Sequence, residues 1–130
     1  MQETETSHFW VGHFPEAMTF TYFDEVYDED DEARDHTPLS LFARDQGEKW
    51  YDHDFLEYGF SDTAASVEEL VAGYSYSDQW GSELARRASE SGLTGINWFA
   101  FISEREIERP RSVQGDGYWY HYLGTITYHI

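Results

Sequence analysis

The sequence predicts an α+β fold, with a single domain over residues 1–130 in which helices pack on an antiparallel sheet of about four strands. Segments rich in aromatic and β-branched residues are interspersed with segments of helical periodicity, which indicates both strands and helices. The 130 residues are enough for one domain and few for two. The hydrophobic fraction of 40%, with 18% aromatic residues, supplies material for a core although the mean hydropathy is -0.69.

The first expected element is a strand over residues 7–13, which are rich in aromatic and β-branched side chains. Because successive side chains of a strand point to opposite faces, Phe9 and Val11 should share one face and His8 and Trp10 the other.

A helix is expected to begin near Pro15, since proline suits the first turn of a helix. Apolar side chains then recur at helical spacing, at Phe20, Phe23, Val26 and Tyr27. The acidic residues that follow are unfavourable at the negative end of the helix dipole. The helix should therefore fray near Asp28 and leave residues 29–36 as an exposed loop.

The middle of the chain predicts a short helix over residues 38–46, ended by Gly47. A strand follows over residues 50–60, where alternation is partial and aromatic side chains are frequent. Its aromatic residues include Tyr51, Phe55, Tyr58 and Phe60.

Two helices are expected next. Ser66 and Glu69 form a capping box, which opens a short helix that ends at Gly73. Ser77 is the expected N-cap of a second helix that ends at Gly92. The apolar side chains of this helix lie four residues apart, at Trp80, Leu84 and Ala88, and two basic ones, Arg86 and Arg87, lie toward its end.

The C-terminal third predicts two strands. Residues 96–102 are nearly all apolar and of strand length, which indicates a central strand buried on both faces. A turn at residues 115–117 leads into the last strand, residues 118–128. Alternation places Tyr118, Tyr120, Tyr122, Gly124, Ile126 and Tyr128 on one face, and Trp119, His121, Leu123, Thr125 and Thr127 on the other.

Composition excludes several kinds of site and location. The chain has no cysteine, which excludes disulfides, a thiolate metal site and a cysteine nucleophile. No apolar run approaches the roughly 20 residues of a membrane-spanning helix. The polar, acidic N-terminus is unlike a secretory signal peptide, so a soluble cytoplasmic protein is expected.

The charge is strongly negative and unevenly distributed. The formal net charge is -18, and residues 1–80 carry 20 acidic and 3 basic side chains. Eight of the twelve residues at 24–35 are acidic. Such a chain should repel nucleic acid and anionic membranes and attract basic protein surfaces. Adaptation to high salt is an alternative explanation of the acidity, although the asymmetry argues against a uniform solubility coat.

The most polar group on a predicted strand surrounds His53. With period-two alternation, Asp52 and Asp54 share a face, His53 and Phe55 take the other, and Glu57 lies beyond. Two carboxylates about 7 Å apart along a strand could hold a divalent cation. A polar solvent-facing surface or a partner contact is the more ordinary explanation. No lysine lies nearby to complete a metal–lysine nuclease arrangement.

No other pattern indicates catalysis. The six histidines do not form a His-x-x-x-His pair on a predicted helix, and a Gly-x-Ser-x-Gly elbow is absent. The glycines at 115 and 117 lack the rest of any nucleotide-binding motif and suit a hairpin turn. The sequence therefore predicts no catalytic residue, no metal site and no cofactor.

The chain resembles the immunity protein 22 family, formerly described as a domain of unknown function. The residues that carry the resemblance are Phe9-Trp10-Val11-Gly12, Tyr22-Phe23, Tyr27, Tyr51-Asp52-His53-Asp54-Phe55 with Glu57, Ser66-Val67-Glu68-Glu69-Leu70, Ser75-Tyr76-Ser77, Asn97, and Leu123-Gly124-Thr125-Ile126 with Tyr128. They span nearly the whole chain. The resemblance implies an immunity protein of a bacterial polymorphic toxin system, which binds the C-terminal toxin domain in the cytoplasm and performs no reaction.

The charge and the resemblance together suggest a basic partner. Many such toxins are nucleases, whose substrate grooves must be basic to bind phosphate. The expected toxin-binding residues are the acidic side chains of the 28–35 segment and of the His53 region: Asp28, Glu29, Asp30, Asp31, Glu32, Asp35, Asp52, Asp54 and Glu57.

Three other functions remain open from sequence. The chain could mimic nucleic acid and inhibit a cellular DNA-binding protein, or it could be a metal-dependent hydrolase that uses Asp52, Asp54 and Glu57. It could also be a structural domain adapted to salt, which would unfold at low ionic strength through self-repulsion.

Overall fold

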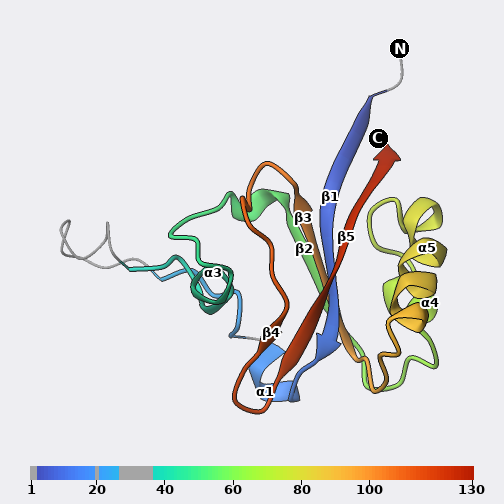
Figure 1. The fold of residues 1–130 in the computed structure, drawn as a ribbon, viewed down its shortest axis with the longest axis horizontal. Helices are drawn as coiled ribbons and strands as arrows, with labels where there is room; N and C mark the ends of the chain where they lie inside the picture. Colours follow the sequence, from blue (N-terminus) through green and yellow to red (C-terminus); the bar gives the residue numbers. More distant parts are fainter. Residues whose placement is uncertain (1–2, 20, 27–36) are drawn as a thin grey trace.

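The computed structural model describes residues 3–19, 21–26 and 37–130, and its centre is one antiparallel sheet of five strands (Figure 1). The strands are β1 (Thr4–His13), β2 (Leu56–Phe60), β3 (Trp98–Ser103), β4 (Val113–Gln114) and β5 (Trp119–His129). Their order across the sheet is β2-β3-β1-β5-β4. The predicted α+β class is confirmed, with five strands instead of about four, because the two-residue β4 is too short to show as a pattern.

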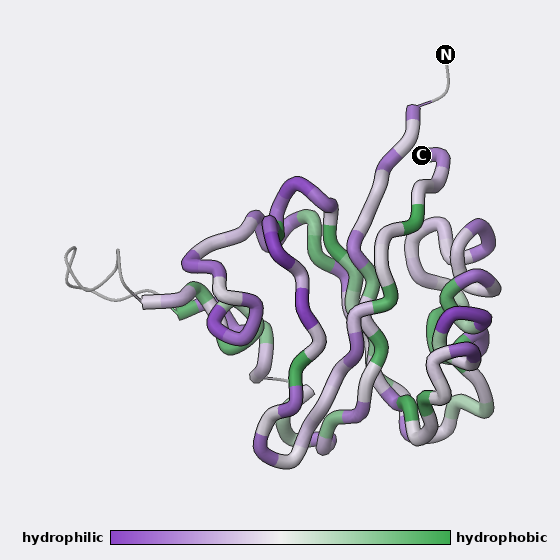
Figure 2. Tube along the Cα trace, in the orientation of Figure 1, coloured by the Kyte–Doolittle hydropathy of each residue, from purple (hydrophilic) through white to green (hydrophobic). Residues whose placement is uncertain are grey.

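Helices cover both faces of this sheet. The helical segments are α1 (Glu16–Thr19), α3 (Leu41–Gln46), the 3-10 turn η1 (His53–Phe55), α4 (Val67–Val71) and α5 (Ser77–Glu90). In Figure 1, α4 and α5 lie on one side of the sheet and α1 and α3 on the other. Hydrophobic residues follow the central strands, and the outer turns of α5 are hydrophilic (Figure 2). No helix in the described ranges is long and apolar enough to cross a membrane.

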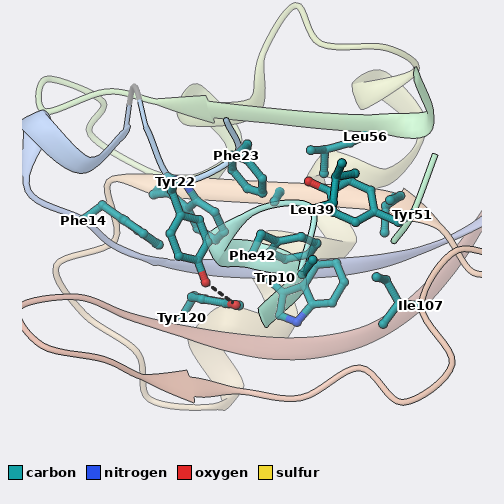
Figure 3. Packing of buried hydrophobic residues seen from close by; sticks show 14 of the residues in the cluster. Trp10, Phe14, Tyr22, Phe23, Leu39, Phe42, Tyr51, Leu56, Ile107 and Tyr120 are labelled. Carbon is teal, nitrogen blue, oxygen red and sulfur yellow. Dashed lines mark hydrogen bonds between the residues drawn. The ribbon is translucent and has the colours of Figure 1, made fainter. Parts of the chain in front are cut away.

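Each face of the sheet has its own hydrophobic core. The α5-side core contains Phe9, Val11, Leu70, Val71, Trp80, Leu84, Ala88, Phe99, Phe101, Leu123 and Tyr128. The α3-side core, shown in Figure 3, includes Trp10, Phe14, Tyr22, Phe23, Phe42, Tyr51, Trp98, Ile102 and Tyr120. The central strands β1 and β3 therefore contribute side chains to both cores, as their sequences predict.

The last strand changes faces at a bulge, which the sequence analysis missed. His8 pairs with Thr125 but Trp10 pairs with Tyr122, so two β5 residues lie opposite one β1 residue. One of these two is Gly124, whose φ of 92° is accessible to glycine and strained for other residues. The prediction of one continuous face is wrong because of this extra residue: Tyr120 and Tyr122 pack on the α3 side, and Leu123, Ile126 and Tyr128 pack on the α5 side.

The first helix is much shorter than predicted. It ends at Thr19, and residues 21–23 form a turn in which the adjacent residues Tyr22 and Phe23 are both buried. Both rings pack against Phe42 of α3. Burial of two neighbouring aromatic rings overrides the helical spacing, and Val26 is exposed. Tyr27 and the predicted loop at 29–36 lie outside the described residues.

The predicted Ser66 cap is confirmed, whereas α3 begins at Leu41, three residues later than predicted. Ser40 caps α3 by accepting a hydrogen bond from the backbone N–H of Ala43 at 3.1 Å. Ser66 caps α4 in the same way through Glu69. The Glu69 carboxylate reaches back to the N–H of Ala65, one residue earlier than a capping box requires.

The start of α5 differs from the prediction. The N-cap is Tyr76, not Ser77, and no side chain caps the first turn. Tyr76 has a φ of 60°, the only positive φ of a non-glycine residue in the described part of the chain. A left-handed conformation costs a non-glycine residue about 1 kcal/mol, which tertiary contacts must offset.

Candidate functional site

The predicted carboxylate strand is a turn in the structure. Asp52 Oδ1 accepts a hydrogen bond from the backbone N–H of Asp54 at 3.0 Å, and the N–H of Phe55 donates to the Asp52 carbonyl. These bonds form the 3-10 turn η1, and β2 begins only at Leu56. Aspartate commonly bonds its own backbone two residues on, and this local option competes with a strand. The expectation that Asp52 and Asp54 share a strand face is therefore wrong.

The turn separates Asp52 from the other two predicted carboxylates. The backbone N–H of Asp52 donates to Glu106 Oε1 at 2.7 Å, which ties it to the segment after β3. Asp54 and Glu57 instead line a groove of about 230 Å³ that Asp52 does not reach.

This groove, called the acidic–aromatic groove below, lies at the end of the sheet where β1 begins and β5 ends. It is lined by Glu5, Ser7, Asp54, Phe55, Glu57, Tyr76, Phe101, Ser103, Tyr128 and Ile130. Figure 1 places this end of the sheet beside the first turn of α5. The groove thus combines three carboxylates with four aromatic rings: Phe55 and Tyr76 from turns, and Phe101 and Tyr128 from strands.

Glu5 is the carboxylate that sequence reasoning missed. It lies on β1, whose predicted start at residue 7 was three residues too late. Extending the strand alternation backward from Phe9 through Ser7 puts Glu5 on the α5 side of the sheet. The strand alternation could have located Glu5, but the polar and acidic residues at the N-terminus are not typical of a strand.

Among the described residues, Arg105 is the cation that approaches a groove carboxylate. Arg105 approaches Glu5 at 3.7 Å, and its guanidinium also lies 6.0 Å from the centre of the Phe55 ring. Glu57 Oε1 accepts a hydrogen bond from the backbone N–H of Ser75 at 3.3 Å. Arg105 is largely exposed, so this ion pair is weak and open to exchange.

The aromatic wall of the groove is held in place yet exposed. The rings of Tyr76 and Tyr128 stack with centres 5.6 Å apart, and the Tyr128 hydroxyl bonds Ser7 Oγ at 2.9 Å. Burial raises the pKa of Tyr128 above its ordinary value. Tyr76 is 44% exposed and Phe55 49%. Exposed aromatic rings beside buried ones are typical of a binding surface.

The carboxylates do not assemble a metal site. Among the described residues, no group of three or more histidine, aspartate or glutamate side chains is placed to hold a metal ion. The geometry thus gives no support to a hydrolase built on Asp52, Asp54 and Glu57.

Two of the described histidines, His8 and His13, form hydrogen bonds with other parts of the chain. His8 Nδ1 bonds the Tyr122 hydroxyl at 2.8 Å, and its Nε2 lies 3.0 Å from the Ile107 carbonyl. His13 Nδ1 bonds the Gly95 carbonyl at 2.7 Å. These rings connect the sheet to neighbouring loops.

A second polar cluster, which the sequence did not predict, lies between α3 and the sheet. The Tyr22 hydroxyl donates to Asp45 Oδ2 at 2.7 Å and bonds the Tyr120 hydroxyl, also at 2.7 Å (Figure 3). Tyr118 donates to the same carboxylate oxygen, and Arg44 binds the other one at 3.0 Å. Burial is the main cause that raises the pKa of both Tyr22 and Tyr120. Because both Asp45 oxygens accept hydrogen bonds from residues distant in sequence or on α3 itself, this cluster anchors α3 to the sheet.

The remaining predicted binding residues lie outside the described part of the chain. They are Asp28, Glu29, Asp30, Asp31, Glu32 and Asp35. The structure therefore brings together Asp54, Glu57 and the unpredicted Glu5.

Comparison with models of protein families gives a match over most of the chain. A family model described as Immunity protein 22 matches residues 8–129, from β1 to the end of β5. The match includes all lining residues of the acidic–aromatic groove except Glu5, Ser7 and Ile130. No curated protein and no solved structure is significantly similar to the chain.

Proposed function

The chain belongs to the immunity protein 22 family, and we propose that it neutralises one cognate bacterial toxin domain by binding it through an electronegative surface. The family match over nearly the whole chain is the observation that carries this proposal. The protein would act in the cytoplasm of toxin-producing cells and catalyse no reaction of its own.

The acidic–aromatic groove supports a protein partner of basic character. Three carboxylates surround it, and exposed rings of Phe55 and Tyr76 form its walls. Binding energy at protein interfaces concentrates on desolvated aromatic and charged anchors, whereas charge complementarity mainly sets encounter rate and partner choice. An arginine or lysine of the toxin matches both properties of the groove.

The overall charge supports a nuclease toxin. Residues 1–80 have a formal net charge of -17, which suits the basic groove that a nuclease needs for phosphate. The six acids at 28–35 would add to this surface. Occupying a substrate groove with carboxylates would block the toxin without any chemistry by the immunity protein.

The direct test is co-expression with the toxin domain encoded beside this gene. The expected result is that the cells survive and that a stable complex co-purifies. The toxin released from this complex should then show nuclease activity. A toxin that kills equally well in the presence of the chain would contradict the immunity function. A complex with an inhibited toxin that is not a nuclease would contradict only the nuclease assignment. Capture of a housekeeping DNA-binding protein instead would favour the nucleic-acid mimic.

A further inference from the structure

The two edges of the sheet differ in how their backbone groups are satisfied. At one edge, β4 pairs only with the start of β5, and the Gln79 amide of α5 donates to the His129 carbonyl at 2.8 Å and accepts from its N–H at 2.9 Å. Arg87 donates to the carbonyls of Leu123 and Thr125, each at 2.9 Å. Together with β4, helix α5 thus occupies much of this edge, as proteins do to prevent edge pairing.

The β2 edge has no such cover in the described part of the chain. The N–H of Ser61 donates to the Asn97 carbonyl at 2.9 Å, which continues the β2–β3 register and places these two residues at a hydrogen-bonding position of the ladder. Pairs alternate in an antiparallel ladder, so Glu57 and Gly59 also bond β3. Tyr58 and Phe60 must therefore direct their N–H and C=O groups away from the sheet. Among the described residues, no hydrogen bond outside the sheet ladder engages these four groups.

A hollow lies directly against this edge. It has a volume of about 340 Å³ and is lined by Thr19, Tyr58, Gly59 and Phe60. The Tyr58 ring stacks on Phe23 with centres 4.2 Å apart and is 38% exposed. An added strand could form hydrogen bonds with the backbone groups of this edge and place a side chain in the hollow.

We propose that the β2 edge binds an extended, basic segment of the cognate toxin as a sixth strand of the sheet. This inference rests on the proposed function and specifies how the toxin is held. The chain has no lysine or arginine from residue 50 to 85 but eight acidic residues, among them Asp54, Glu57 and Asp62 around β2. A second copy would oppose this acidic edge with an identical one, whereas a strand with lysine or arginine complements it.

Amide hydrogen exchange tests the pairing without any substitution. The probe is the ¹⁵N-labelled full chain, free and mixed with the unlabelled toxin domain encoded beside its gene. In the free chain, the Tyr58 and Phe60 amides should exchange fast, and the Gly59 amide, which bonds β3, should be protected. Toxin binding should slow exchange at Tyr58 and Phe60 at least 100-fold. Unchanged rates at both amides in a formed complex would overturn strand addition.

A proline substitution provides an independent test at the same position. Tyr58→Pro removes an N–H that points away from β3, so the ladder within the sheet is kept. The matched control, Tyr58→Ala, also loses the ring stacked on Phe23 but retains the N–H. By titration calorimetry, Tyr58→Pro should bind toxin at least tenfold more weakly than Tyr58→Ala. Equal affinities of the two variants would contradict the proposal.

The outcomes separate this inference from the proposed function. If the wild-type chain binds toxin but the β2 amides stay unprotected, the strand-addition inference fails and the immunity function stands. If the wild-type chain does not bind toxin, both fail. Protection of the same amides in concentrated free chain, with a dimer by ultracentrifugation, would overturn the toxin as occupant in favour of a second copy.

Discussion

The half-buried carboxylate of Asp45 connects several segments of the chain through hydrogen bonds. Its side chain, 13% exposed, binds Tyr22 and Tyr118 through one oxygen and Arg44 through the other. Hydrogen bonds to a charged group contribute more than neutral ones, and unmet buried donors are costly. The tyrosines come from the turn after α1 and from the end of the chain, so Asp45 links three distant segments.

Asp45→Ala should therefore lower the free energy of unfolding by about 2 kcal/mol, because two tyrosine hydroxyls lose their shared acceptor. Chemical denaturation monitored by circular dichroism measures this loss. Asp54→Ala is the control, since it removes an exposed carboxylate and should stay within about 0.5 kcal/mol of wild type. Equal losses in the two variants would show that the cluster does not stabilise the fold.

Asp54 is the groove carboxylate best suited to testing the binding surface. Asp54→Lys should weaken toxin binding at low salt about tenfold, which corresponds to about 1.4 kcal/mol. Glu68→Lys makes the same change in net charge on exposed α4, outside the groove, and should have a smaller effect. Calorimetry at low and high salt compares them. An identical loss in both variants would indicate long-range charge alone and no contact at the groove.

At the scale of elements, the bulge in β5 decides which core each tyrosine of the last strand joins. The extra residue requires a φ of 92° at Gly124. Glycine adopts this conformation readily, whereas it is strained for a residue with a side chain. A Cβ at this position would lie 3.2 Å from Arg87 Nη1. The Arg87 guanidinium donates to the carbonyls of the residues before and after Gly124, so the strand and α5 depend on the same glycine.

Gly124→Ala should lower the free energy of unfolding by about 2 kcal/mol through backbone strain and displacement of Arg87. Gly73→Ala is the matched control, because its φ of 86° is similar and no atom lies near the added Cβ. We expect it to cost about 1 kcal/mol, measured by the same denaturation. A loss no larger at Gly124 than at Gly73 would show that the Arg87 contact adds nothing.

At the scale of the whole molecule, the aromatic core makes stability sensitive to alkaline pH. Burial raises the pKa of Tyr51 to about 12 and raises that of Tyr22 and Tyr120 as well. A folded-state pKa above the unfolded value of about 10 means that the folded chain binds protons more tightly. This contribution is fully present below pH 10 and is lost as pH rises from about 10 toward 12.

Each tyrosine that remains protonated in the folded chain should reduce the free energy of unfolding by about 1.4 kcal/mol per pH unit above pH 10. Tyrosinate absorbance and circular dichroism should therefore change together in an alkaline titration, in one cooperative step. Ionisation of every tyrosine near pH 10 with the fold intact would contradict the buried hydroxyl network.

Sequence predicts well what depends on local patterns and charge. The faces of β1, the doubly buried β3, the cap Ser66 and the α+β class all follow from periodicity and short-range hydrogen bonding. The acidity of the chain and its similarity to a protein family can likewise be recognised from the sequence alone.

Tertiary structure decided the features that depend on contacts distant in sequence. Burial of Tyr22 and Phe23 against α3 sets the end of α1. The bulge, in which β5 has one more residue than β1, sets the path of β5. The acidic–aromatic groove joins Glu5 to Asp54, two carboxylates that only strand pairing brings to the same end of the sheet. Local preferences amount to tenths of a kcal/mol per residue, whereas burying an aromatic ring contributes several times more, so packing prevails wherever the two conflict.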